Sequence, residues 1–176
     1  MTHYTNTSNP IDFPKPALTK RKGNLLDMAD RGDFDIIIQG CNCFNAMGAG
    51  LAPQIARRYP MAEAVDKDTV KGSINKLGNW TFAWNAEAGD APVRFGIINA
   101  YTQYSTSRQG EDVFEYAAFE LILRKLAHQY GAQRYGLPYI GMGLAGGDKK
   151  RILAMIENFA NEISAQGGSV TLVEFG

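Results

Sequence analysis

Apolar positions follow two spacings along the chain, one typical of buried strands and one typical of amphipathic helices. Ile36, Ile37 and Ile38 are consecutive and β-branched, as expected of a strand covered on both faces. Residues 17–40 therefore predict a first strand, a turn and a second strand. Further strands are expected within residues 76–86, 92–103, 133–141 and 167–175.

Helical periodicity marks the segments between these strands. Leu51, Ile55 and Tyr59 share one face of a predicted helix over 51–59, and Pro60 ends it. A second short helix is expected over 61–71, and two long helices over 111–130 and 148–165. Their apolar stripes are Phe119, Ile122, Leu123, Leu126 and Tyr130 in the first and Ile152, Met155, Ile156, Phe159 and Ile163 in the second. Alternating strands and helices predict an α/β fold with helices on both sheet faces.

The length and charge of the chain limit the number of domains and the kinds of partner that it can have. Its 176 residues suit one domain, expected over 17–176 after a loosely ordered N-terminal arm over 1–16. Lys plus Arg and Asp plus Glu are equal at 18 each, so we expect no nucleic-acid partner. The chain lacks an apolar stretch of membrane-spanning length and a signal-peptide apolar region. A cytoplasmic monomer without membrane contact is the resulting expectation.

Cys41 and Cys43 are the two cysteines, and His3 and His128 are the two histidines. A zinc site needs about four ligands, and these histidines are far from the cysteines in sequence, so we expect no metal. A disulfide between residues two apart would be strained in an extended chain. We therefore expect two reduced thiols on the two faces of a strand end.

Two glycine-rich loops each follow an apolar strand and precede a helix. The first is Gly48-Ala49-Gly50, and the second spans residues 141–147 in "GMGLAGG". Ligands of open α/β sheets bind beyond the carboxyl ends of strands, and glycine lets backbone amides approach a phosphate closely. Either loop alone could be a simple turn, but the pair predicts that both hold one diphosphate. Neither loop matches the ATP-binding GxxxxGK[ST] pattern.

Asp148 opens the last predicted helix and has two readings. It could cap the helix, or its carboxylate could face a ligand and act as a general base. Lys149, Lys150 and Arg151 follow in the first turn, where the helix dipole disfavours cations, and a bound anion would offset this. The polar segment over 99–107 suits ribose contacts and also suits an exposed loop.

Four segments, in this order, resemble the macrodomain family: "GNLL", "IIIQGCNCFNAMGAGLAPQIARRYP", "IINAYTQY" and "LPYIGMGLAGGDKKRILAMIE". The resemblance is to the branch of terminal ADP-ribose protein glycohydrolase and the yeast-type ADP-ribose 1''-phosphate phosphatases. It implies a three-layer α/β/α fold with a mixed central sheet and an ADP-ribose cleft. Cofactors are not implied.

The resemblance also implies roles for particular residues. Asn42 matches a polar position near the distal ribose. Asn24 stands where the family usually has an aspartate that accepts a hydrogen bond from the adenine amine. The asparagine oxygen can still accept but carries no charge, so we expect adenine selectivity to be retained and somewhat weaker. The predicted catalytic residues are Asp148 and Asn42, and the predicted ligand-binding residues are Asn24, Leu25, Asn45, Met47, Gly48, Ala49, Gly50, Thr102, Gln103, Gly141, Met142, Gly143, Leu144, Ala145, Gly146 and Gly147.

The catalytic chemistry implied by the glycohydrolase does not carry over directly. Its lysine corresponds here to Tyr101 or Thr102, and its aspartate corresponds to Ala145. Asp148 is the nearest acid, which favours direct attack by a water that Asp148 orients or deprotonates, with Lys149 or Lys150 near a terminal phosphate.

Three functional hypotheses follow from these residues. The first is hydrolysis of ADP-ribose derivatives, either ADP-ribose 1''-phosphate or an ADP-ribosyl ester on a protein. The second is a binding module that reads or sequesters ADP-ribose or another NAD-derived nucleotide without turnover. The third is a structural α/β domain with an empty cleft.

Overall fold

The computed structural model describes residues 16–106 and 112–176, so the predicted arm over 1–16 lies outside this part of the chain apart from Pro16. In chain order the elements are β1 (Leu18–Gly23), α1 (Leu25–Asp30), β2 (Ile36–Asn42), α2 (Ala52–Arg58), α3 (Pro60–Lys67), a 3₁₀ turn (Ile74–Lys76), β3 (Trp80–Trp84), β4 (Gly96–Gln103), α4 (Tyr116–Gln129), β5 (Arg134–Leu137), α5 (Lys149–Ala165) and β6 (Ser169–Phe175). The described strands form one six-stranded sheet in the order β1-β6-β5-β2-β4-β3. Only β3 runs antiparallel to its neighbour, so the sheet is mixed.

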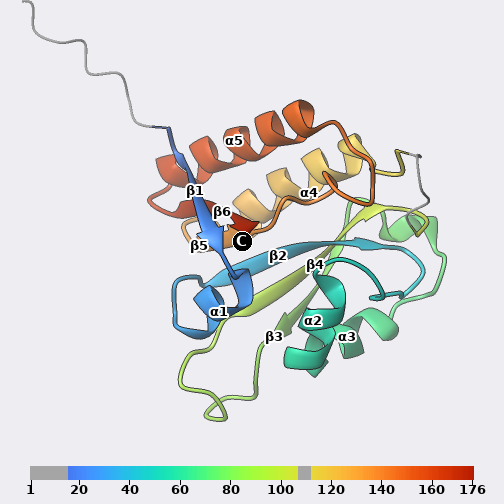
Figure 1. Cartoon of the computed structure of the whole chain (residues 1–176), viewed down its shortest axis with the longest axis horizontal. Helices are drawn as coiled ribbons and strands as arrows, with labels where there is room; N and C mark the ends of the chain where they lie inside the picture. Colours follow the sequence, from blue (N-terminus) through green and yellow to red (C-terminus); the bar gives the residue numbers. More distant parts are fainter. Residues whose placement is uncertain (1–15, 107–111) are drawn as a thin grey trace, which may run out of the picture.

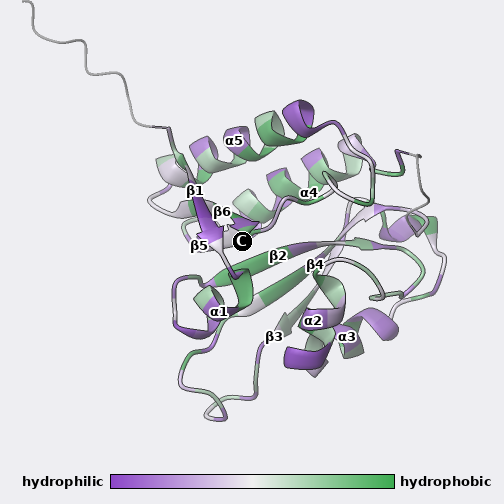
Figure 2. Ribbon diagram, in the orientation of Figure 1, coloured by the Kyte–Doolittle hydropathy of each residue, from purple (hydrophilic) through white to green (hydrophobic). Residues whose placement is uncertain are grey.

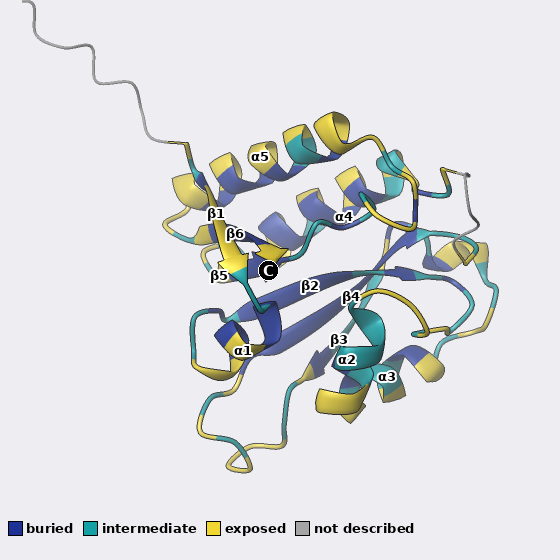
Figure 3. Cartoon of the chain, in the orientation of Figure 1, coloured by how far each residue is buried: buried dark blue, intermediate teal, exposed yellow. Residues whose placement is uncertain are grey.

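Helices cover both faces of this sheet (Figure 1). Ile36 and Ile38 pack into the core beneath α4 and α5, whereas Ile37 packs into the second core with α1, α2 and α3. Successive strand side chains point to opposite faces, so three consecutive isoleucines serve both cores. The central strands are accordingly apolar and buried, and the outer helix faces are polar and exposed (Figures 2 and 3). The three-layer α/β/α prediction with a mixed sheet is confirmed.

The segment between the first two strands differs from the predicted turn. It contains the six-residue helix α1, whose N-cap is Asn24. Two helical turns are too short to show a clear apolar period, but Leu25, Leu26 and Met28 are buried by tertiary packing. The available sequence signal was the cap itself, because asparagine is favoured at this position.

The helix expected over 111–130 begins later, at Tyr116. Residues 112–115 are not helical, and Phe114 forms an isolated antiparallel bridge with Gln103. Glu111 lies outside the described residues. The expected strand over 133–141 is also shorter, because β5 ends at Leu137, directly before Pro138.

Cys41 and Cys43 are free and buried. They do not lie on opposite faces of the strand end as predicted, because both belong to one small apolar cluster with Tyr101. Residues two apart on a strand share a face, which accounts for the difference.

Candidate functional site

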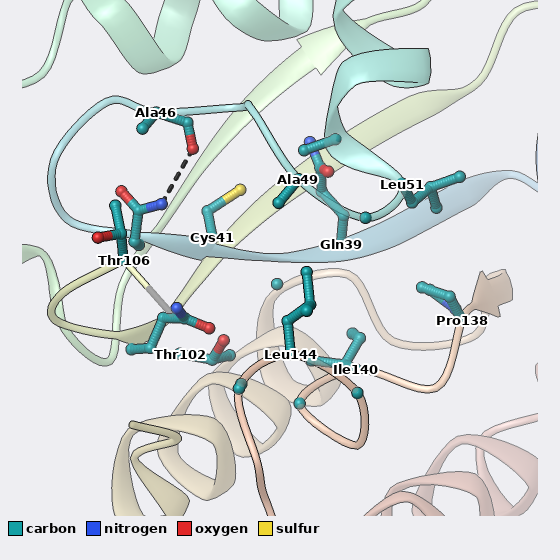
Figure 4. Close-up of a pocket in the computed structure, with 18 of the residues that line it drawn as sticks. Gln39, Cys41, Ala46, Ala49, Leu51, Thr102, Thr106, Pro138, Ile140 and Leu144 are labelled. Atoms are coloured by element: carbon teal, nitrogen blue, oxygen red, sulfur yellow. Dashed lines mark hydrogen bonds between the residues drawn. The ribbon is translucent and has the colours of Figure 1, made fainter. Parts of the chain in front are cut away.

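A cavity of about 480 Å³ lies beyond the carboxyl ends of β2, β4 and β5 (Figure 4). Both glycine-rich loops contribute to its walls. It is lined by Gln39, Gly40, Cys41, Asn42, Ala46, Gly48, Ala49, Gly50, Leu51, Ala52, Thr102, Gln103, Thr106, Pro138, Tyr139, Ile140, Gly141, Gly143, Leu144 and Ala145. Figure 4 shows Ala49 and Leu51 on one side of β2, with Thr102, Ile140 and Leu144 on the other. Ten residues of the predicted site are thus brought together.

A second cavity of about 360 Å³ adjoins the first and shares Gly50, Leu51, Pro138 and Tyr139 with it. Its remaining walls come from the ends of β1 and β6, the start of α1, and α2. They are Gly23, Asn24, Leu25, Gln54, Val173, Glu174 and Phe175. The two cavities therefore form one cleft along the carboxyl edge of the sheet, which is where ligands bind in open α/β folds.

The backbone amides of both loops are available to a ligand. Among the hydrogen bonds of the described residues, none uses the N–H of Gly48, Ala49 or Gly50, and none uses that of Gly143 or Leu144. A backbone amide away from secondary structure needs a partner from water or from a ligand. Runs of free amides from two loops on one cavity are suited to the oxygens of an anion such as a diphosphate.

Glycine is required where these loops turn sharply. Gly50 and Gly141 have φ of 65° and 74°, values that other residues seldom adopt. A Cβ at Gly141 would also lie 2.4 Å from the Phe114 ring. By contrast, a Cβ at Gly48 or Gly143 would meet no atom within 4 Å, so the space above these two residues is open.

The polypeptide between β2 and the first glycine loop is held by its own polar side chains. Asn42 Oδ1 accepts from the Phe44 N–H at 2.9 Å, and its Nδ2 donates to the Ala46 carbonyl at 2.9 Å (Figure 4). Asn45 has φ of 56°, and its Nδ2 donates to the Thr69 carbonyl at 3.0 Å. Asn42 thus lines the cavity, but both polar atoms of its amide already hold the loop.

Lys76 is a residue of this region that the sequence analysis did not single out. Its side chain is buried, and its ammonium donates to the Cys43 carbonyl at 3.1 Å and to Asn45 Oδ1. The ammonium also lies 4.7 Å from the centroid of the Tyr101 ring. Lys76 therefore fixes the loop that leads to Gly48.

Two buried polar atoms around the cavity have no hydrogen-bond partner among the described residues: Gln39 Oε1 and Thr102 Oγ1. Thr102 was predicted to contact a ligand, whereas Gln39 was not. A buried acceptor without a partner destabilises the protein by roughly 1–3 kcal/mol. Such atoms are therefore concentrated where a ligand or water supplies the missing hydrogen bond.

The cavity is electrically neutral over its described walls, which carry no Asp, Glu, Lys, Arg or His. Cys41 lines it, but burial and the nearby Asp66 carboxylate raise the pKa of its thiol well above the ordinary value. A protonated thiol is a poor nucleophile, so Cys41 is not suited to covalent catalysis. The polar groups that these walls offer are amides, hydroxyls and backbone dipoles.

Asp148 is not brought into the cavity. It is the N-cap of α5, its Oδ1 accepts from the Arg151 N–H at 3.0 Å, and its own N–H donates to the Tyr116 hydroxyl at 2.8 Å. Asp148 is exposed, so the capping interpretation is confirmed. Lys149 lies nearer the cleft, with its ammonium 5.4 Å from the centroid of the Tyr139 ring.

Five other predicted residues also lie outside the walls of both cavities: Asn45, Met47, Met142, Gly146 and Gly147. The side chain of Asn45 is bound to Thr69 and Lys76, and those of Met47 and Met142 pack against apolar clusters. Tyr101, one of two positions matched to the glycohydrolase lysine, is buried, with its hydroxyl donating to Asp66 at 2.8 Å.

Asn24, predicted to meet the adenine, and Leu25, predicted to bind the ligand, line the second cavity. The Oδ1 atom of Asn24, however, already accepts from the backbone N–H groups of Leu26 and Asp27, at 3.0 and 3.1 Å. The expectation that this oxygen is available to an adenine amine is therefore wrong. What remains for a ligand is Nδ2, which is a donor.

Comparisons with known proteins agree with this fold. The macrodomain of Mycobacterium tuberculosis DarG superposes with a TM-score of 0.64 at 18% identity, covering 89% of this chain and 97% of that one. A Trypanosoma brucei macrodomain in complex with ADP-ribose gives a TM-score of 0.63 at 15% identity, covering 93% and 67%. The chain therefore has the macrodomain fold, as the sequence resemblance implies.

Two curated proteins are similar over most of the sequence. An uncharacterized 17.5 kDa protein of Enterobacteria phage T4 is 27% identical, over 81% of this chain and 89% of the phage protein. The ADP-ribose 1''-phosphate phosphatase of Saccharomyces cerevisiae is 27% identical, over 84% of this chain and 95% of the yeast protein. No protein-family model matches the chain.

Two further findings concern the described residues alone. Their helices include none of the length and apolarity needed to cross a membrane. Their His, Cys, Asp and Glu side chains form no group of three or more that could hold a metal ion.

Proposed function

We propose that the protein binds ADP-ribose derivatives in the cleft. The diphosphate lies between the two glycine loops, where the free backbone N–H groups of Gly48 to Gly50 and of Gly143 and Leu144 donate hydrogen bonds to its oxygens. The base enters the second cavity, whose apolar walls include Leu25, Val173 and the exposed Phe175. The distal ribose occupies the first cavity, which carries the hydroxyl and amide side chains.

One observation carries this proposal: two runs of unpaired backbone amides, from loops about a hundred residues apart in sequence, border one cavity. A structural domain with an empty cleft would have no need to leave both runs unpaired. The similarity in fold to the Trypanosoma brucei macrodomain in complex with ADP-ribose supports the same ligand class.

Calorimetric titration with ADP-ribose, set against ATP and NAD, tests the proposal. We expect ADP-ribose to bind at least tenfold more tightly than ATP, because the neutral cavity has room for one diphosphate and a sugar but no cation for a third phosphate. Equal affinity for the three nucleotides, or binding of none of them, would overturn the proposal.

Hydrolysis of ADP-ribose 1''-phosphate is a second candidate, favoured by similarity over most of the chain to the yeast phosphatase. The described walls of the first cavity supply no acid or base, so a hydrolytic water there would depend on Asp148 from outside them. A non-catalytic reader agrees better with these walls, and for this reason we place binding first.

A phosphate-release assay separates the two candidates. If Asp148 is the general base, Asp148→Asn slows phosphate release from ADP-ribose 1''-phosphate at least tenfold while the affinity for ADP-ribose is unchanged. The conservative amide keeps an N-cap oxygen, so α5 remains capped. Tight binding with no phosphate released by the wild type identifies a reader, and unchanged turnover by the variant removes Asp148 from the chemistry.

A further inference from the structure

Gln39 is a buried side chain in the walls of the first cavity that the proposed function has not used. It is 2% exposed and extends from β2 on the side of Ala49 and Leu51 (Figure 4). One end of its amide is bound, since Nε2 donates to Asn99 Oδ1 at 2.8 Å. The other end, Oε1, has no partner among the described residues.

The orientation of the Gln39 amide follows from a chain of hydrogen bonds that continues behind it. Asn99 Nδ2 donates to the Ala62 carbonyl at 2.9 Å and to Thr81 Oγ1 at 3.0 Å. A carbonyl can only accept, so Asn99 must direct its nitrogen there and its oxygen toward Gln39. Gln39 must then donate with Nε2, and its oxygen is the end of this cavity-lining amide that is left without a partner among the described residues.

The far end of the chain gives the same direction. The Tyr101 hydroxyl donates to Asp66 Oδ1 at 2.8 Å, so the Tyr101 oxygen accepts from Thr81, whose Oγ1 lies 3.2 Å away. Thr81 Oγ1 in turn accepts from Asn99. Every donor therefore points away from the cavity toward buried Asp66, and reversing the Gln39 amide would place two oxygens against each other.

A ligand can form a hydrogen bond with Gln39 Oε1 only if it offers a hydrogen-bond donor. The oxygens of a diphosphate are acceptors, so Gln39 repels them, whereas the free amides of the glycine loops attract them. A sugar hydroxyl is a donor that the proposed ligand class supplies next to its diphosphate. The cavity is thereby divided into a phosphate region along the two loops and a hydroxyl region at Gln39.

We propose that Gln39 Oε1, oriented by Asn99, Thr81, Tyr101 and Asp66, accepts a hydrogen bond from a hydroxyl of the ligand's terminal ribose and so determines specificity for ADP-ribose over ADP. This inference rests on the proposed function, because the terminal ribose belongs to the ligand class proposed there. A satisfied hydrogen bond in a buried site discriminates strongly against a ligand that lacks the donor, since the acceptor is then buried without a partner.

The test is the ratio of the affinities for ADP-ribose and ADP, measured by titration for three proteins. We expect wild type to favour ADP-ribose at least tenfold, and Gln39→Met, which is similar in size but has no acceptor, to reduce this preference about fivefold to tenfold. Gln39→Glu also loses the donor to Asn99 but keeps an oxygen on the cavity side, so it retains the preference. Both variants remove the donor to Asn99, and Gln39→Glu also sets a carboxylate oxygen against Asn99 Oδ1, so a preference that Gln39→Glu retains cannot reflect an undisturbed chain of hydrogen bonds.

The outcomes distinguish this inference from the proposed function. If wild type binds neither nucleotide, the proposed function fails. If wild type prefers ADP-ribose and Gln39→Met retains that preference, or if Gln39→Glu loses it to the same extent, then Gln39 is only structural and the inference fails. Gln129→Met, an exposed substitution of the same kind in α4, should leave both affinities unchanged.

Discussion

At the scale of single residues, the availability of a side chain to a ligand depends on which of its polar atoms already form hydrogen bonds within the fold. Asn24 lines the second cavity, yet its oxygen caps α1 through two backbone amides. Asn42 lines the first cavity, yet its amide closes the turn from Phe44 to Ala46. Gln39 shows the reverse, since it looks like part of a buried strand in the sequence and keeps a free oxygen.

Replacing Asn24 by Asp tests whether the helix cap makes the Asn24 oxygen unavailable to a ligand. A carboxylate can cap α1 with one oxygen and leave the second free to accept from the adenine amine, which the asparagine cannot do. We expect Asn24→Asp to tighten ADP-ribose binding about threefold to tenfold, as measured by titration. Asn75→Asp adds the same charge at an exposed position away from the cleft and should leave the affinity unchanged. Unaltered or weaker binding by Asn24→Asp would show that its carboxylate does not meet the base.

At the scale of elements, the site depends on loops that are anchored from outside the sheet. Lys76, in the 3₁₀ turn, holds the loop after β2 through the Cys43 carbonyl and Asn45, and Thr69 holds Asn45 from the end of α3. The positive φ of Asn45 is maintained by these bonds. The position of Gly48 to Gly50 is therefore decided by residues more than twenty positions further along the chain.

Removal of the Lys76 ammonium should loosen this loop. We expect Lys76→Met to lower the free energy of unfolding by about 2 kcal/mol, because the Cys43 carbonyl and Asn45 Oδ1 lose a charged donor. ADP-ribose affinity should fall with it, since the first glycine loop loses its support. Lys71→Met removes an exposed lysine from the same segment and should change neither quantity. Urea unfolding and titration measure the two effects, and a Lys76 variant with wild-type stability would contradict this account.

At the scale of the whole molecule, the proposed binding cleft and a stabilising ion pair lie at opposite edges of the sheet. The cleft follows the carboxyl ends of the parallel strands, whereas Asp35 and Arg134 join the amino-terminal ends of β2 and β5. Asp35 accepts from the Arg134 backbone N–H at 2.8 Å and from two of its guanidinium nitrogens at 3.1 and 2.8 Å. These bonds hold the pKa of the Asp35 carboxyl below its ordinary value.

This pair makes stability depend on pH. A lowered pKa in the folded state means that the stabilisation is complete above the ordinary aspartate pKa and is lost as the pH falls through the lower, folded value. We expect Asp35→Asn to lower the free energy of unfolding by about 1 kcal/mol at pH 7, a modest value because both side chains are partly exposed. The difference from wild type should narrow at pH 3, as measured by urea unfolding. Asp90→Asn, an exposed control, should show no such dependence, and a constant difference for Asp35→Asn would contradict the assignment.

Much of the fold was predictable because it rests on local patterns. The isoleucine run identified a doubly covered strand, and the stripes of α4 and α5 were identified correctly in their buried members, such as Phe119 and Ile156. Helix α1 was missed because its six residues are helical through tertiary burial and a cap rather than through periodicity. The late start of α4 was missed because Phe114 is held by Gln103, a contact between segments distant in sequence.

The sequence by itself determined the layers of this protein and the two glycine loops, because hydrophobic period and glycine content act over a few neighbouring residues. Only the tertiary structure decided which polar atoms remain for a ligand. Asn24 and Asp148 are used by helix caps, whereas Gln39 and Thr102 are left with unpaired oxygens beside the cavity. Hydrogen bonds are made between atoms that the fold brings together, so their allocation cannot be read from residue types or spacing.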